Sequence, residues 1–246
     1  AEADKFLPRE VATSRLTFNY YALLATRARV AIWQGNKDMA LKYAEELIAM
    51  ELQFPWVDKN RLETNDLQLR DFTFSSEYLF GLNVYQFSKI TELSFEAKVD
   101  ITRTNPQFLV HAAQTGKDLF ELGDNTGAGD YRYLWLYDKL GTQYAFLKLK
   151  QVDKSTYANR LPLIRKAEVY YMAAECLNET GSVTDRQKAI NYLNIVREKR
   201  GIQRKLGNDL SQSVVQQEIL KEWRKEMLLE GQMFFYYKRR GVTNIQ

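Results

Sequence analysis

The stretch Leu163-Ile-Arg-Lys-Ala-Glu-Val-Tyr-Tyr-Met-Ala-Ala-Glu175 decides the fold, because apolar residues occupy nearly every face of the helix that it predicts. Pro162 stands just before it, and proline suits the first turn of a helix, where no amide donor is needed. A helix that is apolar nearly all round is buried among other elements. We therefore expect a buried helix over Leu163–Leu177 in a mainly α-helical fold.

A second helix follows after a short turn. Apolar residues recur at helical spacing over Ala189–Val196, and Thr184 with Gln187 predicts a capping box at the start. Two basic residues and then Gly201 predict the end of this helix. Small residues, Ala174 and Ala189, stand where the two helices should cross, which is typical of a tetratricopeptide-type hairpin.

A similar hairpin is expected near the amino terminus. Residues 14–34 and 40–48 show the same three- and four-residue spacing of apolar side chains, and Gly35-Asn36 separates them. Trp33 lies within this hairpin, where packing is the simplest role. A third helical stretch begins after Ser211 or Ser213 and is interrupted at Gly231. The helical hairpins are therefore expected over 14–50 and 161–241.

The segment 51–160 predicts a loop-rich insertion with short strands. Alternating apolar residues indicate one strand near 78–84, and Gly123–Asp130 is expected to be a loop. Aromatic residues then alternate with others over residues 131–137, which predicts a second strand, and Gln143–Gln151 is its expected return. We expect one domain over 1–246 that contains this insertion.

Composition excludes several classes of protein. The 246 residues carry a formal charge of +4, and Lys and Arg alternate with Asp and Glu, which argues against nucleic-acid binding. One cysteine and one histidine exclude a disulfide scaffold and thiolate or multi-histidine zinc sites. A Ser-His-Asp relay could use only His111. No cofactor or metal is expected, and no run of about 20 apolar residues predicts a membrane span.

Four blocks resemble the SusD/RagB family in the same order. The helix Leu163–Glu175 is similar to a helix that is typical of the family. Ala189–Gly201 is similar to the helix that follows it in that family. Glu222-Trp-Arg-Lys-Glu226 with Glu230-Gly231 resembles its closing block, and Arg27–Ala40 its early helix pair. The strong blocks cover roughly residues 160 to 241. Met233 and Tyr236 stand where the family carries arginine and aspartate, so aromatic packing is expected to replace that ion pair.

The resemblance implies an outer-membrane lipoprotein at the cell surface of Bacteroidetes-type bacteria. It implies binding of glycans or other nutrients and delivery to a SusC-like TonB-dependent transporter. The family's chains are much longer and begin with a lipidated cysteine. We therefore expect this chain to be a carboxyl-terminal portion or a shortened relative, with membrane attachment only through a lipid anchor outside it.

Aromatic residues of the insertion are the candidate ligand contacts. Flat aromatic rings offer apolar contact to sugar rings, and tyrosine hydroxyls can bond sugar hydroxyls. The alternative is that the row is one buried face of a strand. Trp56 follows the first hairpin in a loop-like context, where it is either a lid over the hairpin or a ligand platform. The candidate ligand-binding residues are Trp56, Tyr131, Tyr133, Trp135 and Tyr137.

Charged residues on the recognisable helices predict internal ion pairs. Glu168, Glu175, Arg165 and Arg197 lie among apolar neighbours that leave no room for a substrate. The basic run Lys238–Arg240 is most simply a solvated helix end, and Cys176 a small buried apolar residue.

The sequence predicts nutrient binding without catalysis. One alternative is a tetratricopeptide-type adaptor that grips a protein partner and binds no carbohydrate. A glycoside hydrolase ranks last, since no carboxylate pair stands in a convincing aromatic cleft.

Overall fold

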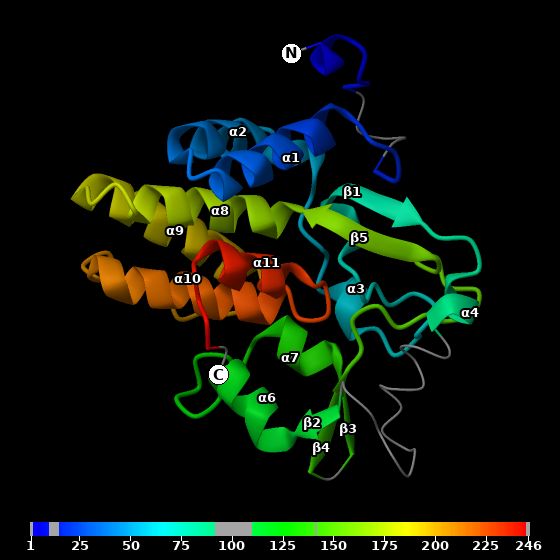
Figure 1. Cartoon of the computed structure of the whole chain (residues 1–246). Coiled ribbons are helices and arrows are strands. Elements are labelled where there is room, and N and C mark those ends of the chain that lie inside the picture. Colours follow the sequence, from blue (N-terminus) through cyan, green and yellow to red (C-terminus); the bar gives the residue numbers. More distant parts are fainter. Residues whose placement is uncertain (1, 10–14, 92–109, 141, 245–246) are drawn as a thin grey trace.

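The computed structural model describes residues 2–9, 15–91, 110–140 and 142–244. Its helices form three stacked pairs, with a two-stranded ribbon at one end and a smaller mixed unit below (Figure 1). The mainly α-helical class predicted from the sequence is confirmed. Short elements lie outside the main layers: the helical turns Ala3–Lys5, Glu51–Gln53 and Ser75–Glu77, and the short helices α3 (Asn60–Glu63) and α4 (Phe87–Thr91).

The first layer is the hairpin of α1 (Tyr20–Trp33) and α2 (Lys37–Ala49). The Asn19 side chain caps α1 by accepting from the Ala22 amide at 2.8 Å, which satisfies one of the free donors at a helix start. Residues 15–19 are therefore not helical, and the predicted start at residue 14 lies outside the described residues. Gly35 takes φ +76°, a conformation that favours glycine, and the chain turns there as expected.

The second layer is α8 (Lys166–Asn178) with α9 (Val183–Lys199). Every residue of α8 is buried, as its all-round apolar sequence predicts. Its predicted start at Pro162 is wrong, because residues 160–165 form strand β5 instead. Proline is tolerated there because β5 is paired on one side only. The predicted cap of α9 is also wrong, since Ser182, not Thr184, accepts from the Asp185 amide at 3.3 Å.

The third layer is α10 (Gln212–Glu226) with α11 (Gln232–Arg239). Ser211 caps α10, and Gly231 at φ +72° separates the two helices, as the sequence predicts. Tyr236 packs on Trp223 with ring centroids 5.4 Å apart, so the expected aromatic packing is confirmed. Lys238 and Arg240 are exposed, as the predicted solvated end requires, but the prediction is wrong for Arg239. Arg239 pairs with the buried Glu175 at 2.5 Å, and Arg240 with the same carboxylate at 3.3 Å.

Two small sheets accompany the helices. Strand β1 (Tyr78–Asn83) pairs antiparallel with β5 (Arg160–Arg165), and β5 runs directly into α8. In the lower unit, β2 (Val110–Ala112), β4 and β3 form a three-stranded antiparallel sheet in that order, beside the helix α6 (Ala113–Leu119). The bounds of the other strands are Tyr137–Leu140 for β3 and Gln143–Phe146 for β4. The expected strand near 78–84 is confirmed, and the return strand ends at 146 rather than 151.

The predicted strand over residues 131–137 is wrong. Tyr131–Trp135 forms the short helix α7, and only Tyr137 enters strand β3. Asp130 explains the difference, because its side chain accepts from the Arg132 amide at 2.9 Å and starts a helix. The four aromatic residues of the row therefore do not share one strand face.

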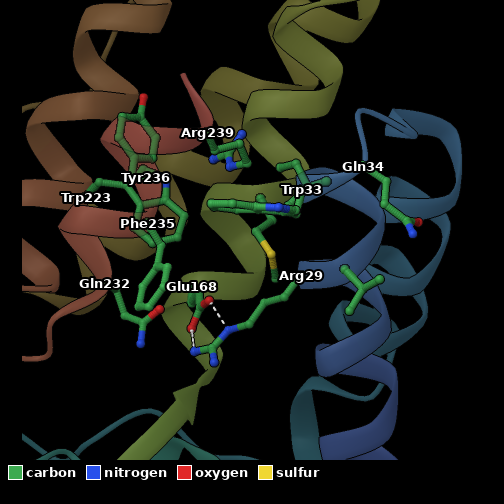
Figure 2. Close-up of a pocket in the computed structure, with 12 residues that line it drawn as sticks. Arg29, Trp33, Gln34, Glu168, Trp223, Gln232, Phe235, Tyr236 and Arg239 are labelled. Atoms are coloured by element: carbon green, nitrogen blue, oxygen red, sulfur yellow. Dashed lines mark hydrogen bonds and ion pairs between the residues drawn. The ribbon is translucent and has the colours of Figure 1, made fainter. Parts of the chain in front are cut away.

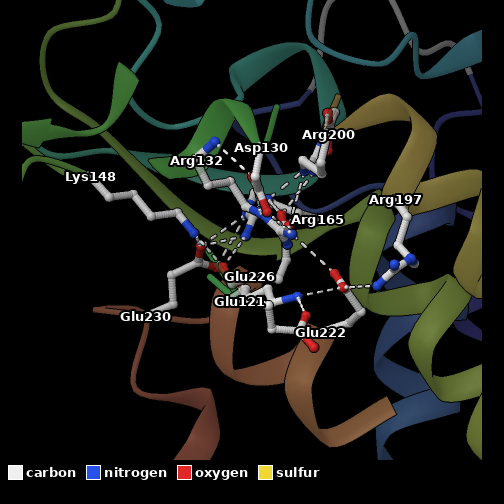
Figure 3. Close-up of polar contacts among 12 residues, drawn as sticks. Glu121, Asp130, Arg132, Lys148, Arg165, Arg197, Arg200, Glu222, Glu226 and Glu230 are labelled. Atoms are coloured by element: carbon white, nitrogen blue, oxygen red, sulfur yellow. Dashed lines mark hydrogen bonds and ion pairs between the residues drawn. The ribbon is translucent and has the colours of Figure 1, made fainter. Parts of the chain in front are cut away.

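A network of buried charges joins α10 to its surroundings (Figure 3). Glu226 stands at its centre and pairs with Arg165 at 2.5 Å, and with Arg132 and Arg200 at 2.9 Å each. All four side chains are fully buried. Burial alone would raise the pKa of Glu226, but the three guanidinium charges outweigh it and hold the pKa well below its usual range.

Further carboxylates complete the network. Arg132 also pairs with Asp130 at 2.7 Å, Arg200 with Glu77 at 2.6 Å, and Arg165 with Glu230 at 2.6 Å. These pairs connect the lower unit, the β-ribbon and the helical layers. The expected internal ion pairs of Glu168, Glu175, Arg165 and Arg197 are also confirmed. Arg197 pairs with Glu222 at 3.0 Å, and Glu168 with Arg29 at 2.5 Å.

Glu226→Gln should destabilise the protein by about 3–5 kcal/mol, because it leaves three buried guanidinium groups short of a full counter-charge. Chemical denaturation of the variant and the wild type measures this difference. Glu198→Gln is the control, since Glu198 is exposed and lies 3.7 Å from the exposed Lys205. Equal stability of both variants would contradict the central role of Glu226.

Ala174→Leu should cost ~1–3 kcal/mol by overpacking the main core between α8 and α9. Ala174 of α8 and Ala189 of α9 are both fully buried. The control is Ala49→Leu at the exposed end of α2, which adds the same side chain without a packing cost. A denaturation midpoint equal to that of the control would contradict a tight helix crossing.

Candidate functional site

A cavity of about 610 Å³ opens beside the β-ribbon, between the segment before α1, the loop after α2 and the start of β5. We call it the Trp56 cavity. Segments far apart in the sequence meet here because β1 and β5 bring residues near 78 and 160 together. The residues that matter for its chemistry are Arg15, Trp56, Asp58, Arg61, Asp71, Tyr157 and Arg160.

Trp56 is held rigidly at this cavity. Its ring packs on Tyr170 of α8 with centroids 5.4 Å apart, and the Lys166 ammonium lies 4.3 Å from its centroid. The Lys166 ammonium also donates to the Phe54 carbonyl at 2.8 Å, which ties the loop to α8. The neighbouring Val57 amide donates to the buried Glu77 carboxylate at 3.0 Å. Trp56 thus packs on the second hairpin while it also lines the cavity.

Three arginines line the cavity without a carboxylate partner among the described residues. Arg15 donates to two carbonyls, those of Ser76 at 2.6 Å and Gln53 at 3.3 Å. Arg61 donates to the Tyr157 hydroxyl, and the Arg160 guanidinium lies 5.4 Å from the centroid of the same tyrosine ring. These contacts hold the arginines in place. The bond to Tyr157, and then the charges of Asp71 and Asp58, raise the pKa of Arg61, but within the described chain none of the three arginines forms an ion pair.

The two acidic residues of the lining are placed differently. Asp71 is buried, and its two oxygens accept bonds from the amides and hydroxyls of Thr73 and Ser75. Burial raises the pKa of Asp71, against the effect of these bonds. Asp58 is exposed and accepts from the Asn60 amide at 2.9 Å. Asp71 therefore serves the local turn, and neither residue pairs directly with an arginine.

The predicted aromatic row belongs mainly to a second core. Tyr133 and Tyr137 are buried there, and the Tyr137 ring lies 4.8 Å from that of Phe146. Tyr131 and Trp135 are half-buried at the edge of this core. Ligand contact by these four residues stays a prediction, and their packing favours a structural role.

A second pocket of about 460 Å³ lies between α1, α8, α10 and α11 (Figure 2). Its walls are mostly apolar, and Arg29 paired with Glu168 lies at one side. Trp33 and Phe235 meet edge to face with centroids 6.3 Å apart, yet remain 47% and 53% exposed. The predicted packing role of Trp33 is therefore confirmed on one side only, because its ring packs on Phe235 while its outer part stays exposed.

Other classes of site find little support in the described residues. They contain no group of three or more His, Cys, Asp or Glu side chains that could hold a metal ion. Their helices are all too short or too polar to cross a bilayer. Cys176 is buried as expected, and burial raises the pKa of its thiol to about 12, which disfavours the reactive thiolate.

The sequence predicts Trp56 as a candidate ligand contact, but it gives no sign that three arginines and Tyr157 line the same cavity. Arg15, Arg61 and Arg160 stand in three separate segments, with no shared motif. Only the pairing of β1 with β5 and the packing of the loop after α2 bring them to one cavity.

A sequence family and a related sequence bear on the identity of this chain. The SusD family matches residues 112–244 of this chain. The SusD-like protein P38 of Formosa agariphila is 27% identical, over 94% of this chain and 53% of its own length.

Solved structures show the same fold. A SusD-like carbohydrate binding protein from Bacteroides vulgatus has a TM-score of 0.70 at 20% identity, over 97% of this chain and 49% of its own. Surface glycan-binding protein A from Bacteroides thetaiotaomicron was solved in complex with laminarihexaose. It has a TM-score of 0.58 at 18% identity, over 97% of this chain and 58% of its own.

The chain spans about half the length of the curated relative it matches and of the first of these structures. The family match nevertheless covers more than half of the chain itself, and it includes the blocks 163–175, 189–201 and 222–231 that carry the resemblance. The chain belongs to the SusD family.

Proposed function

We propose that this protein binds glycans or related nutrients at the cell surface and delivers them to a SusC-like TonB-dependent transporter of the outer membrane. Family membership supports this, as does the laminarihexaose complex of a protein with the same fold. A lipid anchor outside this chain would hold it at the membrane.

The Trp56 cavity is the observation that carries the proposal. It combines a rigidly held indole with a tyrosine ring and several polar groups in one opening of about 610 Å³. Sugar recognition needs this combination, because apolar ring faces stack on aromatic side chains while hydroxyls seek hydrogen bonds. The second pocket also carries aromatic rings and polar groups, but its walls are mostly apolar, and its two arginines, Arg29 and Arg239, are already paired with Glu168 and Glu175.

The cavity supports binding rather than hydrolysis. A glycosidase needs one carboxyl group as acid and a second as base or nucleophile. Asp71 already accepts hydrogen bonds at both oxygens, and Asp58 is an exposed residue of the rim. We therefore propose that the protein turns over no bound glycan.

Trp56→Ala should weaken oligosaccharide binding several-fold to about tenfold, since a stacked ring contributes ~0.5–1.5 kcal/mol beyond area burial. A panel of oligosaccharides that includes laminarihexaose, followed by calorimetry on the best binder, measures the change. Trp33→Ala is the matched control, because it removes the same side chain from the other pocket.

Trp135→Ala separates the two groups of candidate aromatic residues. If only this variant loses binding and keeps its helical circular dichroism, the ligand site lies at the aromatic row and the Trp56 cavity is not the site. If Trp56→Ala and Trp33→Ala bind equally well, the cavity has no part in binding.

The exposed apolar surface around Trp33, Phe234 and Phe235 is the candidate docking site for the transporter. These side chains are between 47% and 61% exposed. They belong to α1 and α11 of the helical layers, whereas the aromatic row belongs to α7 and β3 of the lower unit (Figure 1). The same surface would serve the alternative function, a tetratricopeptide-type adaptor that grips a protein and binds no carbohydrate.

Phe235→Ser should reduce co-purification with a TonB-dependent transporter after gentle extraction of native membranes, because it removes an exposed ring from this surface. Tyr85→Ser is the control, since Tyr85 is also exposed but lies beyond the β-ribbon. Unchanged recovery of the transporter with Phe235→Ser would place the docking surface elsewhere. Recovery of another protein, without any glycan binding, would favour the adaptor.

A further inference from the structure

We propose that the Trp56 cavity selects acidic oligosaccharides, in which a uronate carboxylate or a sulfate ester binds among Arg15, Arg61 and Arg160. This inference rests on the proposed function and names the chemical class of its ligand. It follows from the charge balance of the cavity and from the partners of each arginine.

The cavity arginines differ from those of the buried network. Arg132, Arg165 and Arg200 each pair with two or more carboxylates at 3.0 Å or less. In the cavity, the acceptors are carbonyl oxygens for Arg15 and a phenol for Arg61. A guanidinium bonded to neutral acceptors keeps its full charge available to an anion.

Arg160 is the most available of the three. It is half-buried, and its guanidinium lies over the Tyr157 ring. Within the described chain its side chain neither donates a hydrogen bond nor forms an ion pair. Its planar group can donate two parallel hydrogen bonds to a carboxylate or a sulfate. An acid group bound there would lie beside an aromatic ring that can contact the sugar.

Two of the arginines, Arg15 and Arg160, also repel one another. The lining carries three guanidinium groups and two carboxylates, one of which is occupied by hydrogen bonds of its own turn. Burial lowers the pKa of Arg15, and the positive charge of Arg160 lowers it further. The guanidinium groups of Arg15 and Arg160 therefore interact. An anion between them would relieve this repulsion, whereas a neutral sugar would not.

Paired probes that differ only in charge provide the test. Oligogalacturonate is compared with its fully methyl-esterified form, and a sulfated galactan oligosaccharide with its desulfated form. We expect each acidic member to bind at least about tenfold more tightly, because hydrogen bonds to charged groups are among the stronger ones. Preference within only one pair would identify the acid group as carboxylate or sulfate. Binding should also weaken as salt rises.

Arg160→Gln should abolish most of this preference, because it should weaken binding of the acidic member of each pair far more than binding of its neutral counterpart. Arg224→Gln is the matched control, since Arg224 is exposed on α10 and forms no ion pair among the described residues. Circular dichroism verifies that both variants are folded. Because Arg160 donates no hydrogen bond within the described chain, its replacement leaves no broken partner behind.

Failure of the inference differs from failure of the proposed function. If neutral and acidic probes bind equally and Arg160→Gln changes neither, the cavity binds glycans without selecting charge, and the inference is overturned. If Trp56→Ala alters no binding or no probe binds at all, the proposed glycan site and the inference fall together.

Discussion

The Glu226 carboxylate, with three guanidinium groups around it, is the interaction on which the structure depends. Arg132 belongs to the lower unit, Arg165 to the end of β5 and Arg200 to the end of α9. A single buried carboxylate therefore holds three segments that the sequence separates. Removing four charges from water is costly, and only complete mutual pairing offsets that cost. The surrounding carboxylates Asp130, Glu77, Glu222 and Glu230 provide it.

The network also positions the candidate site. Arg200 holds Glu77, and Glu77 accepts from the Val57 amide, next to Trp56. Arg165 ends the strand whose first residue, Arg160, lines the cavity. The indole and the cavity arginine are thus both attached to elements that the network holds. A binding group on a loop gains precision when the scaffold beneath the loop is rigid.

Arginine has two different roles in this protein, one in the buried ion-pair network and one in the lining of the Trp56 cavity. Where it is buried among carboxylates, it is part of the architecture, as Arg165 is. Where carbonyls or a phenol are the partners, as for Arg15 and Arg61, the charge remains unneutralised. Residue type alone does not distinguish the two cases. The sequence predicts ion pairs for Arg165 and Arg197, but it contains no pattern that assigns Arg15, Arg61 and Arg160 to a shared cavity.

Local sequence determined the helices and most of their ends. The apolar spacing of α1, α2, α8, α9 and α10, the glycines at 35, 201 and 231, and the family blocks were readable because each depends on neighbours within a few residues. The tertiary structure decided the rest. The helix Tyr131–Trp135 is an exception, because its cap, Asp130, directly precedes it and the cause is local. Pro162, in contrast, lies in a strand because β1 is there to pair with it. The exposure of Trp33 and the meeting of Arg15, Arg61 and Arg160 were decided in the same way. Contacts between residues so far apart in the chain leave no periodic pattern in the sequence.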